Sequence, residues 1–368
     1  MKLSLLSEGL QKKLSFANHA ISSRNQLPIL SHFLLEAKDG KLKIAATDLE
    51  IGIETFVPAS IEEEGGVTIP AKLFLELINA ISQEKISLQT KDGGLEVVSK
   101  KTKSLIQTSP KEEFPTLIEE KGQKELVMQG KEFKKYFSKV VFAASIESTR
   151  PALSGVLVKR QGSVVALVAT DGYRLSFEKM QGTEDAKEHE LSLLIPVKVL
   201  REALSLSDEQ EIVLYSSKKK NQIVFEQEDI SIVGRLIEAE FPQYEKIIPT
   251  DFSTKITFDR EEMLKAVKTC AIFARETANI VTLSLQKEKI TLSAKTASLG
   301  ENTDEVEAKL TGEENDIAFN VRYLIEFLSN VQEEEVLFEM TGPLNPGVFH
   351  VVGNENFLHL IMPIRTQG

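Results

Sequence analysis

The sequence predicts an α+β protein in which one domain is repeated three times. Three stretches carry this prediction: IPAKLFLELI, IPVKVLREAL and FNVRYLIEFL, which begin at Ile69, Ile195 and Phe319. In each copy the apolar residues recur at the spacing of a helix with one buried face. The period is about a third of the chain, which is far longer than the roughly 20 to 50 residues of a solenoid unit. Each copy is therefore expected to be a domain with its own core.

A second helix and a strand pair recur with the same period. The helix carries apolar residues at i, i+4 and i+7 in each copy, namely Leu10, Leu14 and Ala17; Phe133, Phe137 and Val140; Met263, Val267 and Cys270. Alternating apolar and polar residues predict strand pairs over 41–55, 164–178 and 288–302. We therefore expect antiparallel strands on the outside of each domain and two helices packed against one face.

Domain boundaries are predicted where the chain is polar and rich in turn residues, near 122–126 and 250–254. The predicted domains are 1–123, 124–252 and 253–368. Cys270 is the only cysteine, so no disulfide forms within the chain and a reducing compartment is favoured. The apolar run before Glu8 is too short for a secretory signal, and no stretch approaches the roughly 20 apolar residues of a membrane span. A cytoplasmic location is expected.

Cations recur with the repeat, although the chain has a formal net charge of −11. They occupy one position on each predicted helix: Lys72, Lys198 and Arg322 on one, and Lys12, Lys135 and Lys265 on the other. One interpretation is a solvated i, i+4 ion pair between the first three and the glutamates Glu76, Glu202 and Glu326. The other interpretation is that a polyanion faces both helices of every repeat.

The second interpretation requires a particular geometry. Repeated domains joined head to tail close into a ring or continue as a filament. If two chains close as six domains, twelve helices spaced about 10 Å apart give a circumference of about 120 Å. After one helix width is removed, roughly 28 Å remains across the opening. Duplex DNA, about 20 Å across, would pass through it.

Six segments in order along the whole chain resemble the bacterial DNA polymerase III beta subunit family, the sliding clamps. They are LPIL at 27–30, TDLE at 47–50, ATDGYRL at 169–175, EFPQY at 240–244, FNVRYL at 319–324 and MPIR at 362–365. The resemblance implies a ring-shaped homodimer of three similar domains per chain, which encircles double-stranded DNA as a processivity factor. It also implies partners that carry short clamp-binding peptides, among them the replicative polymerase catalytic subunit and the clamp loader. No cofactor, catalytic activity or membrane partner is expected.

The resemblance also assigns residues. It places DNA contacts at Arg24, Lys72 and Lys198, and at Thr149 and Arg150 in the loop 145–153, which lacks the aromatic residues often found there in clamps. It places ring closure where Ile272 and Phe273 of one chain meet Leu105 and Ile106 of the other. The implied peptide groove comprises Leu153, Thr170, Gly172, Tyr173, Arg174, Leu175, Pro242, Ile247, Asn320, Tyr323, Met362, Pro363, Ile364 and Arg365. Aliphatic and Met side chains suit a groove that accepts many short peptides. Leu175, Ile247 and Ile364 are equally compatible with the domain core.

Two alternatives come from other classes of protein. A hydrolase built on Asp48 and Asp171 would need a divalent metal, but Tyr173 stands where phosphatases of that kind carry a second acid. Asp171 is instead expected to accept hydrogen bonds in a tight turn. The five histidines have no metal-ligand spacing, and no phosphate-binding Gly-rich loop precedes a helix. A repeat scaffold that binds only proteins would keep the groove and be indifferent to charge reversal at Lys72, Lys198 and Arg322.

Overall fold

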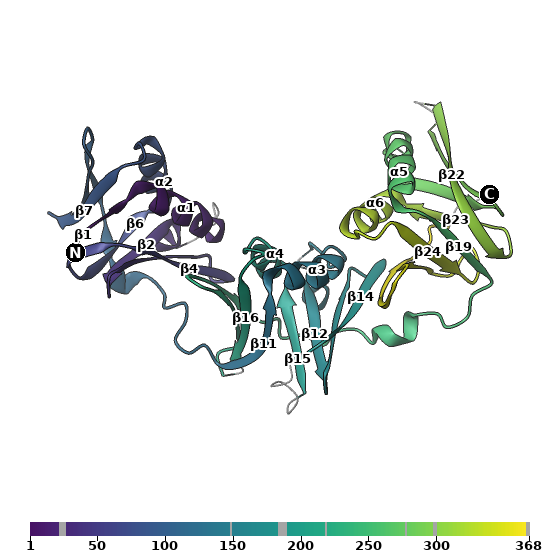
Figure 1. The fold of residues 1–368 in the computed structure, drawn as a ribbon, viewed down its shortest axis with the longest axis horizontal. Coiled ribbons are helices and arrows are strands. Elements are labelled where there is room, and N and C mark those ends of the chain that lie inside the picture. The colour runs from purple at the N-terminus through teal and green to yellow at the C-terminus, as the bar shows by residue number, and fades with distance from the viewer. Residues whose placement is uncertain are drawn as a thin grey trace. The chain divides into compact units, whose positions relative to one another are not determined.

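The computed structural model describes residues 1–21, 27–147, 149–182, 190–217, 219–276, 278–296 and 300–365 (Figure 1). The chain divides into two compact units. Met1–Phe133 and Lys198–Leu236 form the first, and Lys134–Val197 and Ile237–Gly368 form the second. The division passes through the central repeat, so each unit contains one complete terminal repeat and part of the central one. The two domain boundaries given above stay a prediction.

The first unit contains two antiparallel sheets. One has the strand order β5 (Ser60–Glu63), β1 (Lys2–Leu6), β7 (Lys85–Lys91), β8 (Gly94–Val98) and β9 (Lys103–Gln107). The other has the order β10 (Ser109–Pro110), β6 (Gly65–Pro70), β2 (His32–Lys38), β3 (Lys41–Thr47), β4 (Ile51–Pro58), β18 (Ile230–Arg235), β17 (Gln222–Gln227), β16 (Glu211–Ser217) and β11 (Gln123–Gln129). The pairing of β4 with β18 joins the first repeat to the second in one continuous sheet.

The second unit contains one long antiparallel sheet. Its order is β15 (Leu191–Pro196), β12 (Gly155–Gln161), β13 (Val164–Thr170), β14 (Arg174–Gln181), β26 (Asn354–Ile361), β25 (Gly347–Val351), β24 (Glu335–Met340), β19 (Thr254–Asp259), β22 (Gly300–Gly312), β21 (Lys289–Thr296), β20 (Ile280–Leu285) and β23 (Asn315–Asn320). Here β14 pairs with β26 and joins the second repeat to the third. The predicted α+β class is confirmed, and the three predicted strand pairs are β3 with β4, β13 with β14 and β21 with β22.

Two helices belong to each repeat, as predicted. They are α1 (Ser7–Ala17) and α2 (Ala71–Ala80), α3 (Gly130–Val141) and α4 (Val197–Ala203), and α5 (Arg260–Ala274) and α6 (Val321–Asn330). Figure 1 shows α5 and α6 side by side, and α5 packs mainly against β21 and β22, while α6 follows and contacts β23. Short polar side chains begin both of these helices: the Asp259 carboxylate accepts from the Glu262 N–H, and the Asn320 amide oxygen accepts from the Arg322 N–H. Such caps satisfy backbone donors that the helix itself leaves unpaired.

The predicted apolar faces of the first helices are confirmed. The residues at i, i+4 and i+7 are buried in α1, α3 and α5. For the second helix the repeat pattern predicts that Leu73 is on the buried face, and this is wrong. Leu73 is 51% exposed on α2, whereas its equivalent Val199 on α4 is buried. The apolar face of α2 is therefore carried by Phe74 and Ile78, and is narrower than the pattern predicts.

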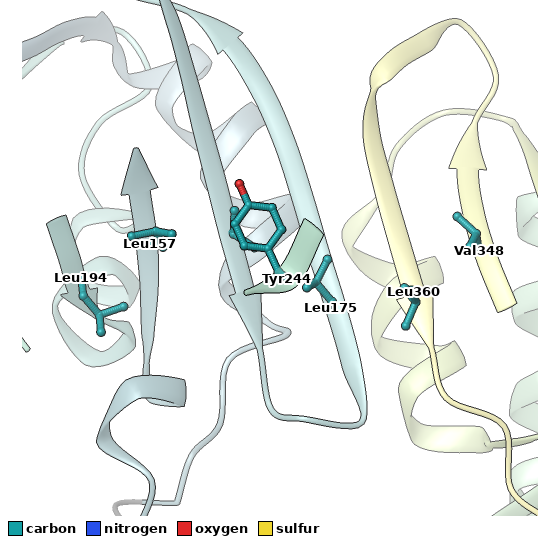
Figure 2. Close-up of a cluster of buried hydrophobic side chains, with 7 residues drawn as sticks. Leu157, Leu175, Leu194, Tyr244, Val348 and Leu360 are labelled. Atoms are coloured by element: carbon teal, nitrogen blue, oxygen red, sulfur yellow. The ribbon is translucent and has the colours of Figure 1, made fainter. Parts of the chain in front are cut away.

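The segment after β18 packs against the face of the second unit's sheet. Figure 2 shows Tyr244 beside Leu175 of β14, with Leu157 on β12 and Leu194 on β15. This cluster buries its side chains from water, and burial raises the pKa of the Tyr244 hydroxyl to about 12, with the neighbouring Glu245 acting in the same direction. Two similar Phe-Pro segments, EEFPTL at 112–117 and AEFPQY at 239–244, each place their last residue in a core cluster, Leu117 in the first repeat and Tyr244 in the second. No described helix is long and apolar enough to cross a membrane.

Candidate functional site

The repeated Thr-Asp sequence builds the same hairpin turn in two repeats. In the second repeat the Thr170 hydroxyl donates to the carbonyl of Arg174, at 2.6 Å, and accepts from the N–H of Gly172. The Asp171 carboxylate accepts from the N–H groups of Tyr173 and Arg174, at 2.9 and 3.0 Å. The expected role of Asp171 as a turn acceptor is therefore confirmed.

The first repeat makes the same bonds with different residues. The Thr47 hydroxyl donates to the carbonyl of Ile51 and accepts from the N–H of Leu49, while Asp48 accepts from the N–H groups of Glu50 and Ile51. Both turns use the aspartate oxygens to hold the backbone. Among the described residues, no three His, Cys, Asp or Glu side chains gather as a metal site.

Each turn is followed by a strand that pairs across a junction between repeats. At the first junction the Arg235 N–H donates to the carbonyl of Glu50, at 3.2 Å; at the second the Met362 N–H donates to the carbonyl of Tyr173, at 2.8 Å. Two residues further on, Ile237 donates to Leu194 and Ile364 to Ala318. We call these two places the first junction, β4 with β18, and the second junction, β14 with β26. The strand register and these two main-chain bonds are the same at both junctions.

Arg174 organises the second junction from a buried position, only 6% exposed. Its Nε lies 3.1 Å from Asp171 Oδ2, its Nη2 donates to the carbonyl of Phe142 at 2.7 Å, and its Nη1 lies 2.7 Å from Glu326 Oε2. The guanidinium also lies over the ring of Tyr323, 4.6 Å from its centre. The planar fork of Arg suits this set of directed contacts. Arg174 therefore fixes the position of α6 relative to the β14 turn.

The residues predicted for the groove divide into a buried set and an accessible set, which we call the rim. Leu153, Thr170, Arg174 and Leu175 are buried, and Leu175 belongs to the core cluster of Figure 2. The rim carries exposed or half-buried groups: Gly172, Tyr173, Pro242, Ile247, Asn320, Tyr323, Met362, Pro363, Ile364 and Arg365. Contacts join part of the set, since Met362 bonds to Tyr173 and Arg174 lies over Tyr323. For Leu175 the core interpretation is correct.

A buried polar pair lies directly beneath this junction. The Ser176 hydroxyl and the His359 Nδ1 are 2.7 Å apart on facing strands, and both residues are fully buried. The His359 ring stacks on Phe327 of α6 with centroids 4.9 Å apart. Burial, reinforced by the nearby Arg174 charge, lowers the pKa of His359 well below its ordinary value. The imidazole is therefore neutral at physiological pH.

Sequence reasoning missed several residues that shape the second junction. Phe142, Glu326 and His359 contact Arg174 or the ring of Phe327, yet none carries a groove motif. The sequence does single out Glu326, because a glutamate recurs one turn after the cation in all three helices. The ion-pair interpretation gives Glu326 the partner Arg322, whereas in the structure it contacts Arg174.

The predicted DNA-facing cations are exposed, and their partners differ. Lys12 pairs with Glu8, and Lys135 lies over the ring of Tyr136. Lys72, Lys265 and Arg322 have no side-chain partner within the described part of the chain. Lys198 is paired with Asp48 and also lies 3.6 Å from Glu50. Thr149 and Arg150 are exposed, and Arg24 lies outside the described residues.

The alternative interpretation, a repeated i, i+4 ion pair on the second helix, is wrong. Glu202 bonds to His19 and Glu326 contacts Arg174, so neither pairs with the cation one turn before it. No pair joins Lys72 to Glu76 among the residues that the structure describes. Glu202 and Glu326 instead contact neighbouring elements. Within the described part of the chain, Lys72 and Arg322 therefore remain available for another anion, whereas Lys198 is paired with Asp48.

Two of the four residues predicted at the dimer interface are exposed. Leu105 is on β9, an edge strand of the first unit, and Ile272 is on α5; both are exposed, while Phe273 is half-buried and Ile106 is buried. Cys270, one turn away from Phe273, is fully buried, and burial raises its thiol pKa to about 11. This thiol is in the unreactive protonated form at neutral pH.

The repeated domain, with two helices against antiparallel sheets in each copy, is the fold of the sliding clamps. Family models of the DNA polymerase III beta subunit match its three parts: the N-terminal domain at residues 1–118, the central domain at 127–243 and the C-terminal domain at 245–365. The chain belongs to the bacterial DNA polymerase III beta subunit family.

Individual relatives agree over the whole length. A beta sliding clamp of Synechococcus elongatus is 29% identical over 378 residues, covering all of both chains. The crystal structure of a DNA polymerase III beta subunit from Thermotoga maritima is 27% identical with a TM-score of 0.90, and that of a DNA polymerase sliding clamp from Bacillus subtilis is 25% identical with a TM-score of 0.95. Both structures and this chain cover each other completely. Membership of this family makes the chain a processivity subunit rather than an enzyme.

Proposed function

We propose that two copies of this chain close into a ring that encircles duplex DNA and holds DNA-processing proteins to it. One observation carries the proposal. The same strand junction occurs twice within the chain, at β4 with β18 and at β14 with β26, and one further edge of each kind has no partner among the described residues. These edges are the first half of β22 and the strand β9.

Topology identifies the two edges as equivalents of the paired ones. Strand β22 follows β21 as β4 follows β3 and β14 follows β13. Strand β9 completes the meander β7, β8, β9, as β18 completes β16, β17, β18 and β26 completes β24, β25, β26. A third junction between β22 of one chain and β9 of a second chain would repeat the pattern, and two such junctions close a dimer with two-fold symmetry.

The charges of the two edges favour the pairing of β9 with β22 over the pairing of β9 with β9 or of β22 with β22. The β9 region carries Lys100, Lys101 and Lys103, whereas the free half of β22 carries Glu301, Asp304, Glu305 and Glu307. Opposite charges across an interface select the partner, and like charges exclude the wrong one. Charged edge strands also resist unspecific strand addition. Leu105, exposed on β9, and Ile272, exposed on α5, would supply the apolar contact.

In this ring the exposed cations of the helices would contact phosphates. Contacts to phosphates carry no base sequence, and few of them give weak, salt-dependent binding. Such binding suits a protein that must stay on DNA by enclosure and still move along it. The sequence holds no nucleotide-binding motif, so a separate ATP-driven machine would open and load the ring. The accessible rim at Tyr173, Tyr323 and Met362 would take short peptides of polymerases and other partners.

Closure is tested with complementary charge variants. One variant carries glutamate at Lys100, Lys101 and Lys103, and the other carries lysine at Glu301, Asp304 and Glu307. Each alone places like charges at both junctions and should sediment as a monomer of 41.0 kDa, whereas an equimolar mixture should form a heterodimer of twice that mass. If both variants remain dimers alone, these edges do not form the interface.

Encirclement is tested separately by dissociation from DNA. Once loaded, the wild-type ring should leave a linear duplex within the time it takes to slide off an end, and leave a closed circle far more slowly. Equal dissociation rates from the two templates would rule out a topological link. The groove has its own test, since Tyr323→Ala should weaken partner peptides without changing retention on circular DNA.

A further inference from the structure

A second cleft lies at the first junction, within the first unit. It is bounded by the turn Thr47–Ile51, by the segment 115–117 and by the end of β18, and its volume is about 170 Å³. Leu49, Leu117 and Val233 supply apolar walls, and Lys220 and Arg235 lie at its margin. An apolar cavity of about 150 Å³ is enough to hold benzene. The cleft therefore has room for one large apolar side chain.

Leu49 in this cleft is unfavourable for the isolated chain on two counts. Its φ angle is +75°, in the left-handed region that a branched side chain rarely adopts, and its side chain is 54% exposed. The equivalent turn of the second repeat has Gly172 at this place, with φ +93°, and makes the same hydrogen bonds. The turn thus needs no leucine. A strained residue that the fold does not require is a sign of function.

The charges around the cleft leave one cation uncompensated. Lys198 is paired with Asp48, and Lys220 is paired with Glu119. Arg235 is exposed and has no side-chain partner among the described residues. An exposed leucine beside an unpaired guanidinium matches a ligand that combines an apolar side chain with a carboxylate. A single carboxylate fits better than a nucleic acid, because one free guanidinium can neutralise one anionic group, whereas the row of phosphates of a nucleic acid would also meet Glu50 in the cleft and Glu119 beside Lys220.

We propose that this cleft is a second docking site, which takes a short acidic and apolar peptide segment of a partner protein. One apolar side chain of the segment enters the cavity against Leu49 and Leu117, and a neighbouring carboxylate bonds to Arg235. The site lies at the first junction, whereas the groove of the proposed function lies at the second, so each can be removed without the other. Two partners could then bind one chain at once.

The test uses 12-residue random peptides displayed on phage, selected on the wild-type protein and depleted on the L49G/R235Q double variant. Selected peptides are synthesised, and their affinities are measured by fluorescence anisotropy against wild type, L49G, R235Q and, as the matched control at the other junction, Y323A. We expect peptides with an acidic residue next to a large apolar one. Their dissociation constants should rise at least tenfold for L49G and for R235Q, and should not change for Y323A.

Folding does not confound this test. Glycine relieves the strain at position 49, so L49G should melt at nearly the wild-type temperature, and L49N offers a second variant whose side chain tolerates the left-handed conformation. If the depletion step leaves no enriched peptide, or if all selected peptides bind L49G and R235Q as well as wild type, the second site does not exist. Peptides that lose affinity only on Y323A would sink the second site and leave the groove of the proposed function standing.

Discussion

The two junctions within the chain have the same backbone and opposite chemistry. At the first, Ile53 of β4 faces Ile232 of β18, and the pair is fully buried. At the second, the equivalent places hold Ser176 and His359, which bond to each other. The comparison extends to the turns: Ile51 stands at the first junction where Arg174 stands at the second.

The comparison teaches that hydrogen bonds of the main chain set the geometry of a junction, and side chains decide its use. An apolar pair such as Ile53 and Ile232 stabilises the sheet without orienting its neighbours. Arg174 loses hydration on burial, but its directed contacts to Asp171, Glu326 and Tyr323 fix α6 beside the β14 turn. The rim proposed for partner peptides is built on this polar junction, and the strained Leu49 is found at the apolar one.

The largest effect should come from giving the second junction the side chain of the first. Arg174→Ile leaves Asp171 and Glu326 without their cation and the Phe142 carbonyl without its donor. Removing one partner of a buried ion pair costs about 3 to 5 kcal/mol, and because Glu326 is half exposed we expect about 3 kcal/mol. Urea unfolding measures the loss. Arg150→Ala, an exposed arginine nearby, should change stability by less than about 0.5 kcal/mol; similar values for both variants would show that Arg174 does not organise the junction.

The second prediction concerns pH. In the folded protein the pKa of His359 is depressed, so below about pH 6.5 the unfolded chain binds a proton that the folded chain does not. Stability should therefore fall as the pH falls through 6.5, by up to about 1.4 kcal/mol per pH unit. His359→Phe keeps the ring stacked on Phe327 and cannot titrate, so its unfolding free energy should decline less steeply between pH 6.5 and 5. Parallel curves for the two proteins would mean that His359 is protonated in the folded state.

The sequence predicted the repeat, both helices of each repeat and the strand pairs, because these depend on local periodicity and on a pattern that occurs three times. The groove residues were predicted from the resemblance to the family, and the residue types supported only its apolar character. Phe142, Glu326 and His359 were missed because their roles arise from contacts between residues far apart in the chain. Leu49 was missed for another reason: TDLE was read as a family motif, and the sequence alone gives no φ angle.

A third, smaller effect exchanges the turn residues. Gly172→Leu places a branched side chain at φ +93°, and its Cβ would make only ordinary contacts, the nearest at 3.5 Å. The cost is therefore the backbone strain alone, about 1 to 2 kcal/mol. Leu49→Gly should change stability by less than about 1 kcal/mol, because relief of the same strain offsets the greater freedom of glycine in the unfolded chain. Thermal unfolding of the pair measures both, and a neutral Gly172→Leu would mean that this turn is not strained by a side chain.

The smallest effects should distinguish a paired lysine, Lys198, from an unpaired one, Lys72, at equivalent positions of α4 and α2. Lys198 is tied to Asp48 and Glu50, whereas Lys72 has no partner among the described residues. An exposed pair contributes about 0 to 1 kcal/mol, so Lys198→Ala should destabilise the protein slightly and Lys72→Ala should not. For DNA the order should reverse: a free lysine that neutralises a phosphate contributes about 0.9 to the slope of log K against log salt, and Lys72→Ala should reduce that slope more than Lys198→Ala. Anisotropy titrations of a labelled duplex at several salt concentrations measure the slopes, and a larger loss for Lys198→Ala would show that DNA displaces the carboxylates of the first junction.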